Sequence, residues 1–188
     1  MMMKWLYTGL LVMMLSACAN KPQLAPTEFH LTQRLIGQLP APKLHAPLST
    51  QELITTSVRG HELSFMAMMT IKDNTLTLMA LTPVGIRVFK TVYDGHAITT
   101  EQYLPNIPLP NMPEILANIM LAHYDAKAWQ GHLPSTIRIQ DEGLTRTLVN
   151  EDQKTILTIQ YAQKGHQKVP IQIHNEVLNY TLTLKNIQ

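Results

Sequence analysis

The stretch Leu63-Ser-Phe-Met-Ala-Met-Met-Thr-Ile71 decides the fold class of this chain, because both of its alternating sets of positions are apolar. One set contains Leu63, Phe65, Ala67 and Met69, and the other contains Met66 and Met68. Successive side chains of a strand point to opposite faces of a sheet. A strand with this pattern is covered on both faces, or it faces the core on one side and a ligand on the other. The stretch therefore predicts a β-rich protein.

Short strands separated by turn residues flank this stretch. The predicted strands of this first group are 52–59, 62–72, 75–82, 86–93 and 96–103. Asp94-Gly95 is a strong signal for a two-residue hairpin, since both positions tolerate positive φ. Such regular spacing without intervening helices favours antiparallel pairing.

A proline-rich connector and a helix follow the first group of strands. The connector spans residues 104–113, and its last proline, Pro113, suits the first turn of a helix with Asn111 or Met112 as the capping residue. An apolar stripe at helical spacing consists of Ile115, Leu116, Ile119 and Met120. The sequence predicts that this helix ends near residues 123–124.

A second group of strands completes the chain. The predicted strands are 135–140, 144–149, 154–161, one in which Val169, Ile171 and Ile173 alternate with polar residues, and one in which Tyr180, Leu182 and Leu184 do so. These last strands are predicted to be wet on one face and apolar on the other.

The segment before the strands is predicted to begin with a helix. Thr27 starts a candidate short helix that includes Phe29, and Gly37 weakens it before Pro40 ends it. Residues 40–47 are rich in proline and predict an extended connector.

The first eighteen residues have the layout of a secretory signal. Lys4 supplies a positive charge, residues 10–15 form a short apolar core, and small residues lead up to Cys18, the only cysteine of the chain. The core is shorter than the roughly 20 apolar residues that a transmembrane helix needs.

Leu15-Ser-Ala-Cys18 resembles the lipobox of bacterial lipoproteins. The resemblance implies that residues 1–17 are a signal peptide and that Cys18 carries acyl chains such as palmitate and anchors the protein. Ala19 stands where an Asp commonly marks retention at the inner membrane, so the resemblance implies the outer membrane of a Gram-negative bacterium, with the folded domain in the periplasm. The alternative is an ordinary signal peptide cut nearby, which leaves a free cysteine.

Composition bounds the rest of the chain. Its length suits one domain with a real core, so we expect residues 18–27 to be a lipidated tether and residues 28–188 a single domain. A net charge of +2 without a basic cluster argues against nucleic-acid binding. Charged residues make up only 15% of the chain and apolar ones 45%, with 11 methionines. Methionine adapts to varied apolar partners, so these residues line a cavity or, alternatively, fill gaps in the core.

The order of the predicted elements resembles that of the lipoprotein carrier and receptor proteins LolA and LolB. Short motifs agree with the receptor: Thr82-Pro-Val-Gly85, Gly131-His-Leu-Pro134, and the closing pattern of Tyr161, Val169-Pro-Ile-Gln-Ile173 and Tyr180-Thr-Leu-Thr-Leu-Lys185. The resemblance implies a mainly β fold with helices (α+β), namely a curved antiparallel half-barrel of about nine to eleven strands with helices over the concave face. The chain is also similar to an uncharacterised family of bacterial lipoproteins encoded beside aryl polyene biosynthesis enzymes. It departs from the receptor in its proline-rich insert and in lacking a recognisable protruding apolar loop.

These expectations define a candidate site for a hydrophobic ligand. The expected wall or lid residues are Phe65, Met66, Met68, Met69, Leu78, Val88, Leu116, Ile119, Met120 and Trp129. The alternation does not decide which set of each strand faces inward, and a solid core without a cavity is the alternative. The predicted function is that of an outer-membrane-anchored lipoprotein that binds an acylated or otherwise hydrophobic cargo and assists its transfer or insertion. Its expected partners are the membrane, the cargo and a periplasmic LolA-like carrier.

Other classes of function have less support in the sequence. A structural or assembly lipoprotein would hold a protein partner through a strand edge or the proline-rich segment. A hydrolase is disfavoured because no Gly-x-Ser-x-Gly elbow is present, so we expect no enzyme and no cofactor. The eight histidines lack metal-binding spacing, and His123 and His132 are interpreted as solvated surface residues rather than ligands.

Overall fold

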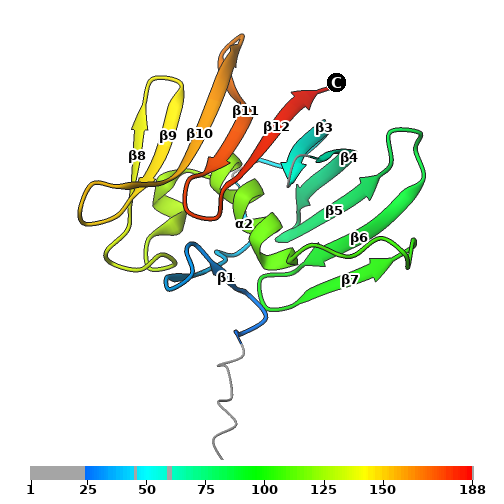
Figure 1. The fold of residues 1–188 in the computed structure, drawn as a ribbon, viewed down its shortest axis with the longest axis horizontal. Helices are drawn as coiled ribbons and strands as arrows, with labels where there is room; N and C mark the ends of the chain where they lie inside the picture. The colour runs from blue at the N-terminus through cyan, green and yellow to red at the C-terminus, as the bar shows by residue number, and fades with distance from the viewer. Residues whose placement is uncertain (1–23, 45, 59–60, 188) are drawn as a thin grey trace, which may run out of the picture.

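The computed structural model describes residues 24–44, 46–58 and 61–187 (Figure 1). The predictions for the signal peptide, for Cys18 and for most of the tether lie outside these residues. Among the described residues, no helix combines the length and the apolar character that crossing a membrane requires.

Ten strands form one antiparallel sheet in the order β7-β6-β5-β4-β3-β12-β11-β10-β9-β8. The first group is β3 (Leu48–Val58), β4 (His61–Lys72), β5 (Thr75–Leu81), β6 (Arg87–Tyr93) and β7 (Ile98–Gln102). The second group is β8 (Arg138–Glu142), β9 (Thr145–Val149), β10 (Thr155–Lys164), β11 (Gln167–Asn175) and β12 (Tyr180–Asn186). The last strand, β12, pairs with β3 and so joins the two groups. The sheet curves but stays open between its edge strands β7 and β8, which confirms the predicted antiparallel half-barrel (Figure 1).

One α-helix, α2 (Met112–His123), lies inside the curve of the sheet (Figure 1). Its start agrees with the prediction, because Asn111 is the capping residue and Pro113 lies in the first turn. A short 3-10 helix, η2 (Ala126–Trp129), follows it. Several helices were predicted over the concave face, whereas α2 is the single α-helix of the described residues.

The N-terminal segment forms a small hairpin, so the helix predicted from Thr27 is wrong. Strands β1 (Glu28–His30) and β2 (Ile36–Gln38) pair with each other and not with the large sheet. The hydroxyl oxygen of Thr32 accepts hydrogen bonds from the N–H groups of Arg34 (3.2 Å) and Leu35 (3.0 Å), which bends the chain back. Local hydrogen bonding by a Thr side chain competes with a helix in this way.

The hairpin between β6 and β7 is confirmed, but its turn is longer than the predicted two residues. Residues 94–97 connect the strands. Oδ1 of Asp94 accepts hydrogen bonds from the N–H groups of His96 and Ala97, both at 2.8 Å, and Gly95 adopts a φ of +95°. The Asp side chain thus closes a wider turn than the dipeptide alone predicts.

The predicted alternation of β11 fails at Ile171. The pairing of β10 with β11 shifts between Gln160, opposite Gln172, and Tyr161, opposite Pro170, so Ile171 is the extra residue of a β-bulge. Ile171 is 38% exposed, whereas Ile173 is 1% exposed. The two isoleucines therefore do not share the buried face that period-two alternation assigned to both.

The hydrophobic core lies between α2 and the inner face of the sheet. Leu116 and Met120 of α2 are fully buried, as are Leu76 of the first strand group and Leu148 and Ile159 of the second. The helix therefore packs against both halves of the sheet at once.

Candidate functional site

The two faces of β4 differ in burial, and this difference decides the orientation that the sequence left open. Ala67 and Met69 are buried on the inner face and contribute to a small cavity beside α2. Met68, on the opposite face, is 45% exposed, and Met66 is half-buried there. The predicted site residues Met66 and Met68 therefore lie outside, away from the surface that Met69 lines.

The other predicted wall or lid residues lie in the core or against it. Five are buried and two are half-buried: Leu78, Val88, Leu116, Met120 and Trp129, and Phe65 and Ile119, respectively. The structure brings Met69 and Leu78 of the sheet and Ile119 of the helix together around one small cavity. Ligand binding by any of these residues stays a prediction.

A cavity of about 10 Å³ lies between α2 and the sheet. The residues that line it are Thr50, Glu52, Ile54, Ala67, Met69, Leu78, Ile119, Ala122, His123 and Leu184. A space of this size holds about one water molecule. The inner face beside α2 is thus closely packed by the protein's own side chains.

Two ionisable residues, Glu52 of β3 and His123 of α2, face each other in the wall of this cavity. Nε2 of His123 lies 3.9 Å from Oε1 of Glu52, and their side chains are 11% and 7% exposed. Oε1 of Glu52 has no hydrogen-bond partner among the described residues. The interpretation of His123 as a solvated residue is therefore wrong.

The helical spacing of the sequence indicates that His123 lies on the buried side of α2. His123 follows Ile119 by four residues and Met120 by three, which places it on the apolar stripe of α2. Glu52 alternates with the buried Ile54 on β3, but alternation alone does not say which face of a strand is inner.

Burial shifts the pKa values of both groups toward their neutral forms. Desolvation raises the pKa of Glu52 to about 7 from 4.5. Desolvation also lowers the pKa of His123 to about 4 from 6.5. Between these two values the closed pair holds one proton and is neutral overall.

Hydrogen bonds attach α2 to the second strand group. Tyr180 of β12 donates to Oδ1 of Asn118 at 2.9 Å, and Tyr161 of β10 donates to the carbonyl oxygen of Ala122 at 3.0 Å. Arg146 of β9 completes this attachment at the C-terminal end of the helix.

The guanidinium of Arg146 is buried, and each of its three nitrogens donates a hydrogen bond. Its Nη1 donates to the carbonyl oxygens of Leu121 (2.7 Å) and Tyr124 (2.6 Å). Its Nε and Nη2 donate to the two carboxylate oxygens of Asp141, at 2.6 and 2.8 Å. This bidentate pair holds the pKa of Asp141 below its usual value.

The contact between α2 and the first strand group is different in kind. Among the described residues, the side-chain hydrogen bond that joins them runs from the hydroxyl of Thr91 to the sulfur of Met112, at 3.2 Å. A thioether is a weak acceptor. Around the cavity, the rest of this contact consists of apolar packing and of the Glu52–His123 pair, whose side chains are not hydrogen-bonded to each other. One side of the helix is therefore anchored by strong hydrogen bonds and the other is not.

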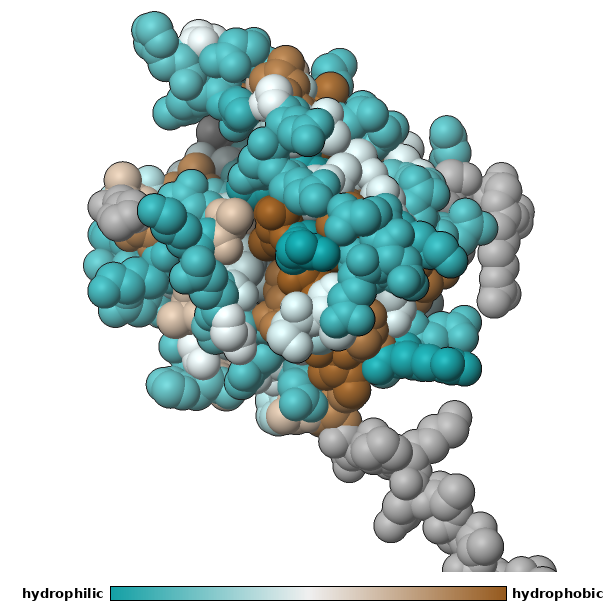
Figure 2. All heavy atoms as spheres, turned by 90° about the vertical axis from the view of Figure 1, so that its left-hand side faces the viewer, coloured by the Kyte–Doolittle hydropathy of each residue, from teal (hydrophilic) through white to brown (hydrophobic). Residues whose placement is uncertain are grey.

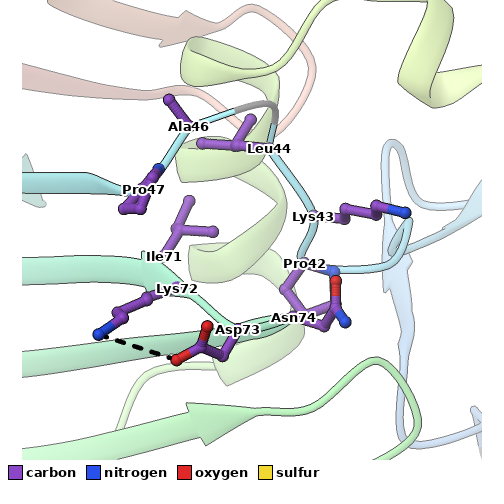
Figure 3. Close-up of a pocket in the computed structure, with 9 residues that line it drawn as sticks. All are labelled: Pro42, Lys43, Leu44, Ala46, Pro47, Ile71, Lys72, Asp73 and Asn74. Carbon is purple, nitrogen blue, oxygen red and sulfur yellow. Dashed lines mark ion pairs between the residues drawn. The ribbon is translucent and has the colours of Figure 1, made fainter.

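A second hollow of about 310 Å³ lies between the N-terminal connector and the β4–β5 turn (Figure 3). Pro42, Leu44 and Pro47 form one side of it, and an exposed ion pair between Lys72 and Asp73, with 3.9 Å between Nζ and Oδ2, lies at its rim. None of the predicted site residues lines it.

The side of the molecule that carries β8 and β9 is mostly hydrophilic, with a band of hydrophobic side chains near its centre (Figure 2). Within the part of the chain that the structure describes, no three or more His, Cys, Asp or Glu side chains are grouped so that they could hold a metal ion.

The fold and the site define a half-barrel protein with one helix packed on the inner face of an open antiparallel sheet. The chain belongs to the family described as "Protein of unknown function (DUF3261)", which matches residues 49–188. The match begins at the second residue of β3 and includes the rest of the large sheet and α2, whereas β1 and β2 precede it.

No curated protein matches this chain by sequence. Among solved structures, the chain is similar to a LolA superfamily protein from Nitrosomonas europaea, with 10% sequence identity and a TM-score of 0.41. That similarity covers 78% of this chain and 86% of the other. The encoding of the protein beside aryl polyene biosynthesis enzymes stays a prediction.

Proposed function

We propose that this protein is a lipid-anchored lipoprotein that binds an acylated or otherwise hydrophobic cargo between α2 and the first strand group. The observation that carries the proposal is the unequal attachment of α2. Strong hydrogen bonds hold the helix to β9, β10 and β12. Toward β3, β4 and β5 the helix instead borders a small cavity and a polar pair whose side chains are not hydrogen-bonded to each other.

Cargo binding then requires α2 to separate from the first strand group while it stays attached to the second. Separation exposes Met69 and Leu78 on the sheet and Ile119 on the helix. An acyl chain that binds there covers these apolar side chains again, and burial of each of its methylenes contributes about 0.8 kcal/mol to the binding free energy. Met69 suits this exchange, because methionine adapts its shape to irregular apolar partners.

The proposed location follows from the N-terminal sequence. Acylation of Cys18 anchors the protein in the outer membrane of a Gram-negative bacterium, and residues 18–27 tether the domain in the periplasm. One acyl chain binds a membrane only marginally, and stable anchoring takes more than one. In this proposal the protein is not an enzyme, and it receives cargo from the membrane or from a LolA-like carrier and assists its transfer or insertion.

The alternative is a structural or assembly lipoprotein that binds a protein partner without a lipid. The open sheet supports it, because β7 ends the sheet with a strand whose one charged residue is Glu101. Edge strands with few charges pair readily with other chains. Capture of one stoichiometric protein partner by crosslinking, with no lipid bound, would favour this alternative.

A photoactivatable sixteen-carbon fatty acid tests the cargo site. The full-length chain carrying Cys18→Ser is labelled, so that its own acyl groups do not compete, and labelled residues are mapped by mass spectrometry. We expect labels on Met69, Leu78 or Ile119. The outer-face residues Met66 and Met68 are the internal control, and labels confined to them, or no labels, would contradict the proposal.

A further inference from the structure

The Glu52–His123 pair lies in the interface that the proposed function requires to open. Both side chains are buried, and the 3.9 Å between Nε2 and Oε1 is too long for a hydrogen bond. In register with Glu52, across the neighbouring strands, are Ala67 of β4 and Asn186 of β12. No other residue that lines the cavity is titratable.

The second strand group contributes ionisable side chains that bond the helix backbone next to His123, and Tyr124, which is also titratable, follows His123 in the chain. Arg146 of β9 bonds the carbonyls of Leu121 and Tyr124, and Tyr161 of β10 bonds that of Ala122, on either side of His123. These groups contact the backbone of the helix, and desolvation alone accounts for the pKa shifts of Glu52 and His123. The two side chains therefore respond to the opening of the interface more than to any charged neighbour.

We propose that Glu52 and His123 act as a compensating pair, which holds one proton in the closed interface and makes the separation of α2 from β3–β5 nearly independent of pH. This regulation rests on the cargo site proposed above. When the helix separates, water reaches both groups. The carboxyl of Glu52 then releases a proton to water, and the imidazole of His123 takes one up, so opening exchanges almost no net protons around pH 5.5.

The two shifts predict how each residue acts without the other. Glu52 alone disfavours the closed state as the pH rises, because its pKa is about 7 closed and 4.5 in water. His123 alone disfavours it as the pH falls, because its pKa is about 4 closed and 6.5 in water. The pH dependences therefore oppose each other and nearly cancel in the wild type.

Amide hydrogen exchange of α2 at pH 5.5 and pH 8.5, corrected for the intrinsic rates, tests this compensation in the full-length Cys18→Ser chain. We expect the opening of the wild-type helix to change by no more than about threefold between the two pH values. His123→Gln should raise opening by about 30-fold over the same interval, and Glu52→Gln should lower it by about 10-fold. The double variant should show no pH dependence from this pair.

Glu62→Gln, an exposed carboxyl on the same sheet, is the matched control and should follow the wild type. Single variants with the flat profile of the wild type would overturn the proposal. If His123→Gln does not fold, NMR titration of the ring nitrogens of His123 in the wild type is the substitute measurement. A midpoint near pH 4 supports burial of the neutral ring, and a midpoint near pH 6.5 contradicts it. If the two single variants show opposite pH dependences but the fatty acid labels nothing, the compensating pair is supported and the cargo site is contradicted. If the fatty acid labels the site but the opposite pH dependences are missing, the cargo site is supported and the compensating pair is contradicted.

Discussion

At the scale of single residues, Arg146 holds the C-terminal end of α2 to the sheet. Arg146→Ala leaves the carbonyls of Leu121 and Tyr124 and the carboxylate of Asp141 without their donor. We expect the free energy of unfolding to fall by about 3 kcal/mol, because the loss of one partner strands buried polar groups. Urea unfolding measures the change. Arg138→Ala, at an exposed position of β8, should change it by less than about 0.5 kcal/mol, and equal losses in the two variants would count against this role of Arg146.

The β-bulge of β11 makes two neighbouring isoleucines unequal. Ile173→Ala removes a side chain that is 1% exposed, so we expect a loss of about 2 to 5 kcal/mol in the free energy of unfolding. Ile171→Ala, at 38% exposure, should cost less than about 1 kcal/mol. Thermal or urea unfolding of the two variants compares them directly. A loss at Ile171 as large as that at Ile173 would place both on the buried face and refute the bulge.

At the scale of elements, the β1–β2 hairpin depends on a close contact between Phe29 and Gly37. A Cβ at Gly37 would lie 2.7 Å from Cζ of Phe29, and the Phe29 ring, at 2% exposure, also contacts Trp129 edge-on at 6.0 Å between centroids. We expect Gly37→Ala to destabilise the protein by about 1 to 3 kcal/mol, because a packed ring has little room to shift.

A second substitution separates this clash from a general effect of the variant. Phe29→Leu in the Gly37→Ala background removes the ring, so the two losses should not add. Urea unfolding followed by tryptophan fluorescence measures Gly37→Ala, Phe29→Leu and the double variant. Additive losses would show that Gly37 is required for a reason other than its contact with Phe29.

At the scale of the whole molecule, the buried carboxyl of Glu52 makes a pH-dependent contribution to stability, which His123 offsets in the wild type and which Glu52→Gln removes. The closed-state pKa of about 7 lies above the value of 4.5 in water, so the stabilising contribution of the protonated carboxyl is complete below pH 4.5 and is lost as the pH rises through 7. Relative to the wild type, Glu52→Gln should therefore gain about 3 kcal/mol in the free energy of unfolding between pH 4 and pH 8. Urea unfolding at the two pH values measures this difference. A difference that does not change with pH would mean that the carboxyl is solvated in the folded protein.

Most strands could be predicted because their signals are local. Turn residues bound β4, β5 and β6 within one or two positions of the predicted ends, and Asn111 and Pro113 mark the start of α2. The predicted N-terminal helix failed for a local and a non-local reason, the local one being the Thr32 hydrogen bonds that bend the chain. Phe29 is buried against Gly37 and Trp129, and this packing favours a hairpin over a helix.

The candidate site was predictable only in part. Met69, Leu78 and Ile119 were expected as wall or lid residues and lie around one small cavity, although ligand binding by them stays a prediction, whereas Met66 and Met68 lie on the outer face. Alternation assigns residues to two faces but does not say which face is inner, because that depends on where α2 packs. Glu52 and His123 were missed for the same reason, since they lie far apart in the sequence and meet only across the helix–sheet interface.

By itself the sequence determined the strands of the meanders, the proline-started helix and the lipobox-like N-terminus, because periodicity, turn residues and caps act between near neighbours in the chain. Only the tertiary structure decided that β12 joins β3, that the inner face is filled by α2, and that a buried carboxyl faces a buried imidazole. These features depend on contacts between distant segments, and the burial that creates them exists only once the sheet has curved around the helix.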